Sequence, residues 1–411
     1  MNNIPLGWSC LQFKYAFKAV PFTTKIKQKE YALTGQYPII DQGEYFIGGY
    51  SDNNYGLITD IPVIAFGDHT RRFKYIDFPF IPGADGLKIY KPIYSETKFS
   101  FYQCLTLEFP NRGYARHNAL LQKCHFYLPP LEEQGRIVDK IEEFFSDIDN
   151  GIKDLKTAQE QIKQYRQSVL KSAFEGKLYK TSEWKEVKLN SISIKIGSGA
   201  TPKGGKHSYY KAGIPIIRSM NVLMNHFSSI GLAYLNDEQA KQLKNVITEK
   251  DDVLLNITGA SIGRTCVLPD YYVNARVNQH VAIIRTTNKI VSKFLSFYLS
   301  TPYMQNKINN ENYGVTRQAL TKSTIENFDI PLPSLPEQQQ IVAEIEKRFA
   351  VADEMEKAVN DSLLQAEKLK QSILKQAFAG KLVPQNPNDE PAAVLLERIK
   401  AAKENSTKGK K

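Results

Sequence analysis

Two short segments in the first third of the chain combine basic, hydroxyl and aromatic side chains, the groups with which proteins contact nucleic acids. Residues 68–75 read Asp-His-Thr-Arg-Arg-Phe-Lys-Tyr, and residues 114–117 read Tyr-Ala-Arg-His. Arginine can bond O6 and N7 of guanine, lysine and threonine suit phosphates, and aromatic rings can stack on bases or contact the thymine methyl group. A solvated basic loop is the alternative, because charged clusters usually face solvent. The candidate DNA contacts in this region are His69, Thr70, Arg71, Arg72, Lys74, Tyr75, Arg116 and His117.

The second half of the chain carries polar residues that follow apolar or glycine-marked turns. Residues 197–206 are rich in glycine, but they match neither G-x-G-x-x-G at the start of a helix nor G-x-x-x-x-G-K-[ST], and Pro202 interrupts any helix there. We interpret them as a loop that offers backbone amides and lysines to phosphate. Arginine, asparagine and glutamine are the side chains that read guanine and adenine. The candidate DNA contacts are Ser198, Thr201, Lys203, Arg218, Ser219, Asn221, Ser261, Arg264, Gln279, Thr316, Arg317 and Gln318.

Motifs for catalysis are weak or missing. The Leu-Pro-Pro-Leu segment at 128–131 lacks the Asp or Asn and the aromatic residue of the adenine methyltransferase motif. Asp85, followed by Glu96 and Lys98, faintly imitates the carboxylates with which nucleases hold Mg²⁺, but such spacings often arise by chance. Cys124 and its neighbour His125 have no further ligands at metal spacing. We therefore expect no catalytic residues and no metal site in this chain.

Composition favours a globular protein with an anionic partner. The 411 residues suggest two to three domains, and 54 Lys and Arg against 43 Asp and Glu leave a net charge of +11. A basic balance of this kind favours polyanions, of which nucleic acid is the common case. The four cysteines are scattered, and neither a secretory signal nor an apolar run long enough for a membrane span is visible. We expect a cytoplasmic location and no membrane partner.

An internal repeat sets the expected architecture. Residues 128–178 return without a gap as residues 332–382, each copy beginning Leu-Pro-x-Leu-x-Glu-Gln and ending Ala-Phe-x-Gly-Lys-Leu. Apolar residues recur in both copies at spacings of three, four and seven, and Gly176 and Gly380 stand where a helix would end. Each copy therefore predicts a helix of about 44 residues, or roughly 65 Å. The two helices are expected to pack on each other as an antiparallel coiled coil; the alternative is that each packs on its own globular neighbour.

The remaining sequence predicts two globular domains with small sheets. In the first, residues 37–40 and 60–67 are apolar runs bounded by turn residues, and in the second residues 214–217 and 252–259 repeat the pattern. The expected fold class is α/β (α+β), with two globular domains of small twisted sheets joined by two long antiparallel coiled-coil helices in pseudo-two-fold arrangement. The expected division is a first globular domain at 1–127, helix segments at 128–179 and 332–383, a second globular domain at 180–331, and a carboxyl-terminal tail at 384–411.

Taken together, these motifs resemble the specificity subunit of type I restriction-modification systems. The repeated helix motif carries most of the resemblance, and the second globular domain resembles the family's target recognition domain at 196–202, 252–264, 278–279 and 330–333. The first domain resembles a variety of it through residues 66–71 and 83–86, although residues 15–22 lack the G-x-T-P element.

The resemblance implies a chain that is not itself an enzyme. Each target recognition domain would read one half of a split, asymmetric site in double-stranded DNA, and the helices would fix the spacer. The chain would hold two methyltransferase subunits and, through them, restriction subunits. S-adenosylmethionine, ATP and Mg²⁺ would be bound by those partners and no cofactor by this chain.

Three alternatives remain open from the residues alone. One is a specificity subunit of a system that only methylates. Another is a self-sufficient nuclease or methyltransferase. A third is a coiled-coil scaffold whose globular domains bind protein, which a steep fall in DNA affinity with salt would exclude.

Overall fold

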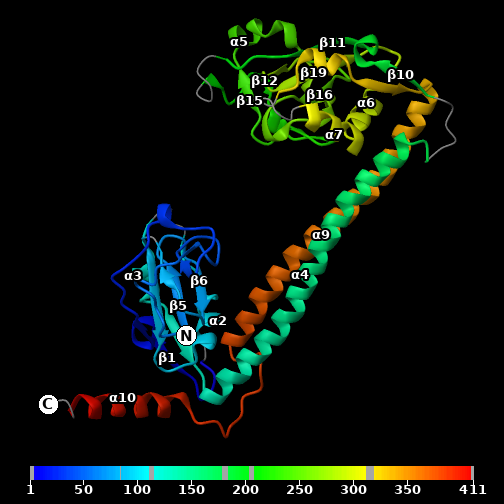
Figure 1. Cartoon of the computed structure of the whole chain (residues 1–411). Coiled ribbons are helices and arrows are strands. Elements are labelled where there is room, and N and C mark those ends of the chain that lie inside the picture. The colour runs from blue at the N-terminus through cyan, green and yellow to red at the C-terminus, as the bar shows by residue number, and fades with distance from the viewer. Residues whose placement is uncertain are drawn as a thin grey trace. The chain divides into compact units, whose positions relative to one another are not determined.

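The computed structural model describes residues 4–83, 85–110, 115–177, 184–202, 208–311 and 319–408 of the chain. It divides into two compact units: unit 1 comprises Met1–Leu155 and Asp361–Lys411, and unit 2 comprises Lys156–Asn360. Each unit holds one globular lobe and part of each of two long helices, α4 (Leu131–Phe174) and α9 (Leu335–Phe378) (Figure 1). The two helices lie within the ranges expected from the repeat.

The lobe of unit 1, called the first lobe, contains three small sheets. A two-stranded sheet pairs β1 with β9, a four-stranded sheet has the order β2-β8-β5-β6, and a three-stranded sheet has the order β4-β3-β7. The elements are β1 (Ser9–Gln12), α1 (Phe13–Ala16), β2 (Phe17–Ala19), β3 (Tyr37–Ile40), β4 (Gly49–Ser51), β5 (Val63–Gly67), β6 (Phe73–Ile76), β7 (Ile81–Pro82), β8 (Leu87–Pro92), α2 (Thr97–Cys104), α3 (Asn118–Leu121) and β9 (His125–Leu128).

The lobe of unit 2, called the second lobe, repeats this plan. Its sheets are β10-β20, β11-β19-β16-β17 and β15-β12-β18, with an additional hairpin of β13 and β14. The elements are β10 (Lys185–Lys188), β11 (Ser193–Ser198), β12 (Ile214–Ile217), β13 (Val222–Leu223), β14 (His226–Phe227), β15 (Ala233–Leu235), α5 (Asp237–Gln242), β16 (Val253–Asn256), β17 (Thr265–Val267), β18 (Arg276–Val277), β19 (Val281–Thr286), α6 (Ser292–Leu299), α7 (Pro302–Glu311), α8 (Lys322–Glu326) and β20 (Asp329–Leu332).

Corresponding strands occupy the same places in the two lobes. β3 and β12 are each the middle strand of a three-stranded sheet with one parallel neighbour, and β5 and β16 are interior strands of the four-stranded sheets. Every residue of β5 and β16 is buried, which explains the apolar run of β5 and of β16 up to Asn256. The equivalence expected from the apolar runs is confirmed, although the lobes have diverged in sequence.

Each lobe packs on the start of one long helix and the end of the other. In unit 1, Ile137, Val138 and Ile141 of α4 share a core with Ile373 and Leu374 of α9 and with the aromatic residues of the first lobe. The residues at the equivalent positions of the repeat, 204 positions later for α4 and earlier for α9, form the corresponding core of unit 2. They are Ile341, Val342, Ile345, Val169 and Leu170. The ends of the long helices therefore pack on the lobes, as the alternative prediction stated. Between these ends the two helices pack on each other, as the main prediction stated.

Ion pairs between the long helices recur at the same repeat distance. In unit 2, Arg166 of α4 binds Asp353 of α9 at 2.7 Å and lies 5.3 Å from the centre of the Phe349 ring. In unit 1, Lys370 of α9 binds Asp149 of α4 at 2.5 Å and lies 5.0 Å from the Phe145 ring. Within unit 2 a second contact joins Gln159 and Asn360 at 2.8 Å, so residue numbers rise along α4 as they fall along α9. The helices are antiparallel, and the predicted fold class is confirmed.

A tryptophan anchors each lobe to the first turn of a long helix. Trp8 donates its indole N–H to Oε2 of Glu133 at 3.1 Å, and Trp184 donates to Oε1 of Glu337 at 3.0 Å. The glutamine that follows each glutamate is fully buried, and Gln134 accepts a hydrogen bond from the Glu96 backbone N–H at 3.1 Å. The Glu-Gln pair of the repeat is therefore the point at which helix and lobe are joined.

The carboxyl-terminal segment belongs to unit 1. Asp389 binds Arg136 of α4 at 2.5 Å, and the backbone N–H of Ala392, the first residue of α10 (Ala392–Lys408), donates to the Gly7 carbonyl at 2.9 Å. Among the described residues, no helix combines the length and the apolar character needed to cross a membrane.

Candidate nucleic-acid interface

Two segments of the first lobe that carry predicted contacts, and the turn that contains Gly86, come together at Asp68. The Asp68 backbone N–H donates to the Gly86 carbonyl at 2.8 Å, which joins the β5–β6 turn to the β7–β8 turn. Its Oδ1 accepts hydrogen bonds from the backbone N–H groups of His117 at 2.8 Å and Asn118 at 2.7 Å. The backbone and the buried carboxylate of Asp68 therefore gather residues 68–72, 85–86 and 115–117 at one edge of the lobe, called the first edge.

The arginines of this edge differ in how they are held. Arg71 adopts a left-handed backbone (φ 62°), which is uncommon for a side chain other than glycine and costs of order 1 kcal/mol. Its Nη1 lies 3.4 Å from the Phe109 carbonyl, and Arg72 pairs with Glu44 at 3.2 Å with both side chains well exposed. Arg71 and Arg72 line a cavity of about 340 Å³, and Arg116 is exposed. The guanidinium groups of Arg71, Arg72 and Arg116 are therefore accessible enough to bind a polyanion.

Two predicted contacts of the first lobe are wrong, because their side chains are buried. Lys74 is 6% exposed, and its ammonium donates to the carbonyls of Asp41 at 2.7 Å and Tyr45 at 2.6 Å. Burial lowers the pKa of Lys74, and the nearby Asp41 carboxylate opposes this. His117 is fully buried, with Nδ1 at 3.1 Å from the Asp68 carbonyl. Both residues hold the loops together from within.

The other predicted residues of the first lobe are partly exposed. The hydroxyl of Thr70 donates to the Gln42 carbonyl at 2.7 Å, so it is already engaged within the lobe. The ring of Tyr75 lies 5.8 Å from that of Phe101, and burial raises its pKa. His69 contributes its backbone N–H to the Gln42 side chain at 3.2 Å. His69 and Thr70 belong to the turn at Asp68, so their side chains would reach DNA as part of the first edge.

The second lobe has an equivalent edge, built from the β16–β17 and β18–β19 connections. The backbone N–H of Ile257 donates to the His280 carbonyl at 3.0 Å, and that of Gly199 donates to the Asn278 carbonyl at 3.1 Å. Leu320 donates to the Ile257 carbonyl at 2.9 Å, which brings in the segment before α8. This second edge gathers the segments that carry five predicted contacts, of which Arg264 and Gln279 are exposed: Ser198, Thr201, Ser261, Arg264 and Gln279.

The predicted cluster at 218–221 forms a closed turn instead. Asn221 is fully buried; its Oδ1 accepts the Arg218 backbone N–H at 3.0 Å and its Nδ2 donates to the Ser228 carbonyl at 2.9 Å. The prediction that Asn221 contacts DNA is therefore wrong. The Arg218 guanidinium lies 5.3 Å from the Tyr209 ring and donates to the Gly231 carbonyl, and the Ser219 carbonyl accepts from Asn256 at 2.9 Å. Lys203, Thr316, Arg317 and Gln318 lie outside the described residues.

The carboxylate constellation suggested by Asp85 does not form. The Asp85 side chain is 91% exposed and pairs with Lys25, whose hydrogen bond lowers the pKa of Asp85. Lys98 pairs with Glu142 of α4 at 2.9 Å. Among the residues that the structure describes, no group of three or more His, Cys, Asp or Glu side chains could hold a metal ion.

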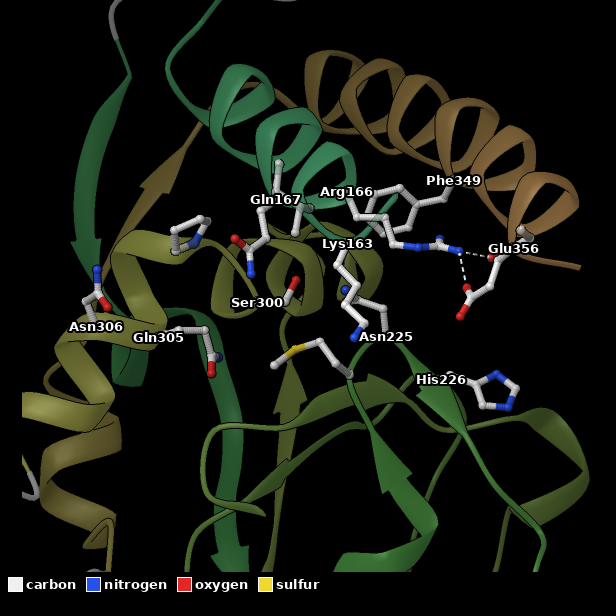
Figure 2. A pocket seen from close by; sticks show the side chains of 14 residues that line it. Lys163, Arg166, Gln167, Asn225, His226, Ser300, Gln305, Asn306, Phe349 and Glu356 are labelled. Carbon is white, nitrogen blue, oxygen red and sulfur yellow. Dashed lines mark hydrogen bonds and ion pairs between the residues drawn. The ribbon is translucent and has the colours of Figure 1, made fainter. Parts of the chain in front are cut away.

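A separate cavity of about 620 Å³ lies in unit 2 between the long helices, the β13–β14 hairpin and the α6–α7 segment (Figure 2). On its helix side Arg166 pairs with Glu356 at 3.0 Å beside Phe349, and amide side chains such as Asn225 and Gln305 line it from the lobe. None of the predicted DNA contacts lines this cavity.

Comparison with known proteins identifies the family. The family described as the type I restriction modification DNA specificity domain matches residues 21–157 and 181–365, well over half of the chain. The chain belongs to this family. The two matched ranges each begin in a lobe and run into the long helix that follows it, so this specificity domain occurs twice in the chain.

Individual relatives agree with the family match. The chain is 33% identical over 312 residues to the type I restriction enzyme EcoBI specificity subunit of Escherichia coli, covering 68% of this chain and 65% of that protein. It is 27% identical over 305 residues to the EcoKI specificity subunit of Escherichia coli (strain K12), covering 67% of this chain and 63% of the relative. The matched region thus spans slightly less than two thirds of the length of these curated relatives.

A solved structure supports the fold. A chain from a study of complex assembly and conformational transition of the type I R-M system matches with a TM-score of 0.66 and 19% sequence identity, covering 92% of this chain and 99% of that chain. At this identity the likeness extends to the fold alone.

Proposed function

We propose that this chain is the DNA sequence-specificity subunit of a type I restriction-modification enzyme and is not itself catalytic. One observation carries the proposal: the two lobes have the same topology but different polar residues at their edges. The helix segments that support the lobes, in contrast, repeat without a gap. Each lobe reads one half of a bipartite site, and the difference between the edges makes the two halves different. Family membership and the net charge of +11 support a DNA ligand.

The long helices determine the spacer and receive the partner subunits in this proposal. Two readers on one face of B-DNA meet equivalent surfaces about one turn, 34–36 Å, apart. Two methyltransferase subunits dock on the helix pair and carry S-adenosylmethionine, and restriction subunits with ATP and Mg²⁺ join through them. In this proposal catalysis belongs to those partners. The four free cysteines are compatible with a cytoplasmic location.

The test is methylation by the reconstituted complex. The purified chain is incubated with genomic DNA and labelled S-adenosylmethionine, alone and with its cognate methyltransferase subunit, and the products are sequenced. We expect methylation only with the partner, at a split motif with two different halves. Methyl transfer by the chain alone, DNA cleavage by the chain alone with Mg²⁺, or an undivided motif would contradict the proposal.

A further inference from the structure

Gln42, which follows β3, lies between the two turns of the first edge. Its Nε2 donates a hydrogen bond to the Asp85 carbonyl at 2.8 Å, and its Oε1 accepts one from the His69 backbone N–H at 3.2 Å. The carbonyl of the same residue accepts the hydroxyl proton of Thr70 at 2.7 Å. One residue therefore ties the turn that carries Arg71 and Arg72 to the turn at 83–86.

The glycines of both turns make room for this side chain. A Cβ on Gly86, whose φ is +93°, would lie 2.7 Å from both the Nε2 and the Oε1 of Gln42. A Cβ on Gly67 would lie 2.9 Å from the Cβ of Gln42 and 2.1 Å from the Thr70 hydroxyl oxygen. The backbones of the two turns thus close around the amide at a distance that only glycine permits.

These contacts make Gln42 a support for the edge rather than a reader of bases. Its carboxamide oxygen and nitrogen are each bonded to the backbone of one turn, which fixes the orientation of the amide between the turns. What it controls is the position of the backbone at 69–72. Arg71 continues directly from that backbone in its left-handed conformation, so a shift of the turn moves its guanidinium.

The second lobe joins its equivalent turns with different groups. There the Ile257 backbone N–H bonds the His280 carbonyl at 3.0 Å, and the hydroxyl of Thr258 bonds Nδ1 of His280. Because each edge has its own internal support, damage to one support should leave the other edge intact.

We propose that Gln42 is a positioning residue for sequence discrimination by the first lobe: its amide holds the turn at 68–72 and the turn that contains Asp85 and Gly86 at the separation at which Arg71 meets its base. The inference rests on the proposed function, since it presupposes that the first edge reads DNA. It adds a residue that acts on base preference by holding the turn that carries Arg71.

The experiment compares Gln42→Leu and Gln42→Glu with Gln122→Leu in the full chain, reconstituted with its methyltransferase subunit. Leucine removes both amide bonds, whereas glutamate keeps an acceptor for the His69 N–H and loses the donor to Asp85. Gln122 is a matched control, since it is a part-buried glutamine of the same lobe that donates to the Tyr90 hydroxyl at 3.0 Å. Methylation rates are measured on the cognate site and on sites with single-base changes in either half, together with the thermal midpoint of each variant.

For both Gln42 variants we expect the preference for the cognate base to fall by about tenfold in one half-site, the size of effect expected when a base contact is misplaced. The affected half should be the one whose recognition Arg71→Ala also weakens, and the other half should keep its preference. Gln122→Leu should lower the thermal midpoint and leave both preferences unchanged.

The inference is overturned if both Gln42 variants keep the wild-type preference in both halves, if the two halves lose preference equally, or if Gln122→Leu has the same effect. The Gln42→Glu variant covers the case in which the leucine variant does not fold. Failure of the proposed function is distinguishable, because the wild-type complex itself would then show no preference for a split site.

Discussion

The bond between Trp8 and Glu133 offers a test of how the first lobe is held on α4. Trp8 is 8% exposed and Glu133 is 1% exposed, and the indole N–H donates to the carboxylate at 3.1 Å. Trp8→Phe keeps an aromatic ring and removes this donor. A hydrogen bond to a charged group contributes about 1.5–3 kcal/mol, so we expect a loss of that size in the free energy of unfolding at pH 7.

The pH dependence of this loss has a definite sign. Burial raises the pKa of Glu133, and the hydrogen bond from Trp8 and the charge of Arg136 oppose that rise. Removing the indole therefore raises the pKa of Glu133 in the folded protein further. The penalty of the substitution is full above the raised pKa of Glu133 in the folded variant, where the carboxylate is charged with or without the indole. It shrinks as the pH falls through the folded-state pKa values of the variant and then of the wild type, because a protonated carboxyl group accepts the indole hydrogen bond less strongly.

Denaturant unfolding followed by far-ultraviolet circular dichroism at pH 7 and pH 4 measures both quantities. In a Glu133→Gln background the effect of Trp8→Phe should no longer depend on pH. Trp184→Phe is the matched control: Trp184 and Glu337 are only partly buried, so water can replace the indole and the expected loss is about 0.5–1.5 kcal/mol. An equal penalty for Trp8→Phe at both pH values would refute the role given to the buried carboxylate.

Three further outcomes are expected. Arg71→Ala and Arg264→Ala should each weaken or relax one half-site by about 1–3 kcal/mol in methylation assays, and unchanged rates at the same sites in both variants would remove these assignments. Lys74→Met should lower the thermal midpoint without changing the slope of log affinity against log salt, whereas Arg72→Ala should reduce that slope by about one if it meets a phosphate. Deleting four residues near Lys156 in α4, with four from the facing turns of α9, should shift the tolerated DNA spacer by about one to two base pairs, and an unchanged spacer would exclude a measuring role for the helices.

The parts of the fold that could be predicted from the sequence are those that depend on residues close together along the chain. The a/d periodicity and the ungapped repeat of 128–178 at 332–382 predict two equal helices. α4 and α9 are equal in length and lie within the expected segments, because helix formation depends on residues three and four apart. The apolar runs at 37–40 and 214–217 likewise mark the middle strands of equivalent sheets. The role of Trp8 was not predictable, because its partner Glu133 lies 125 residues away.

The candidate DNA contacts were predicted from residue type alone. The burial of individual side chains in the structure then showed which of them face inward. The clusters at 68–75 and 115–117 do meet at one edge, yet Lys74 and His117 face inward, where the Lys74 ammonium bonds the Asp41 carbonyl and Nδ1 of His117 lies 3.1 Å from the Asp68 carbonyl. Nothing in the sequence around Gln42 marks it as a support, since the turns that it joins begin more than twenty residues further along the chain. Its only sequence signal is indirect, in Gly67 and Gly86, whose need for space appears once the turns are folded.

The sequence by itself determined the helices, their pairing and the duplication of the lobes, because side-chain periodicity and repetition act over short distances along the chain. Tertiary structure decided which polar side chains remain outside. Arg72 and Arg264 are exposed while Lys74 and Asn221 are enclosed, although all four belong to short polar segments of similar appearance. The reason is physical: a buried polar group is stable only where distant backbone segments supply its hydrogen bonds, and those partners are brought together only by the completed fold.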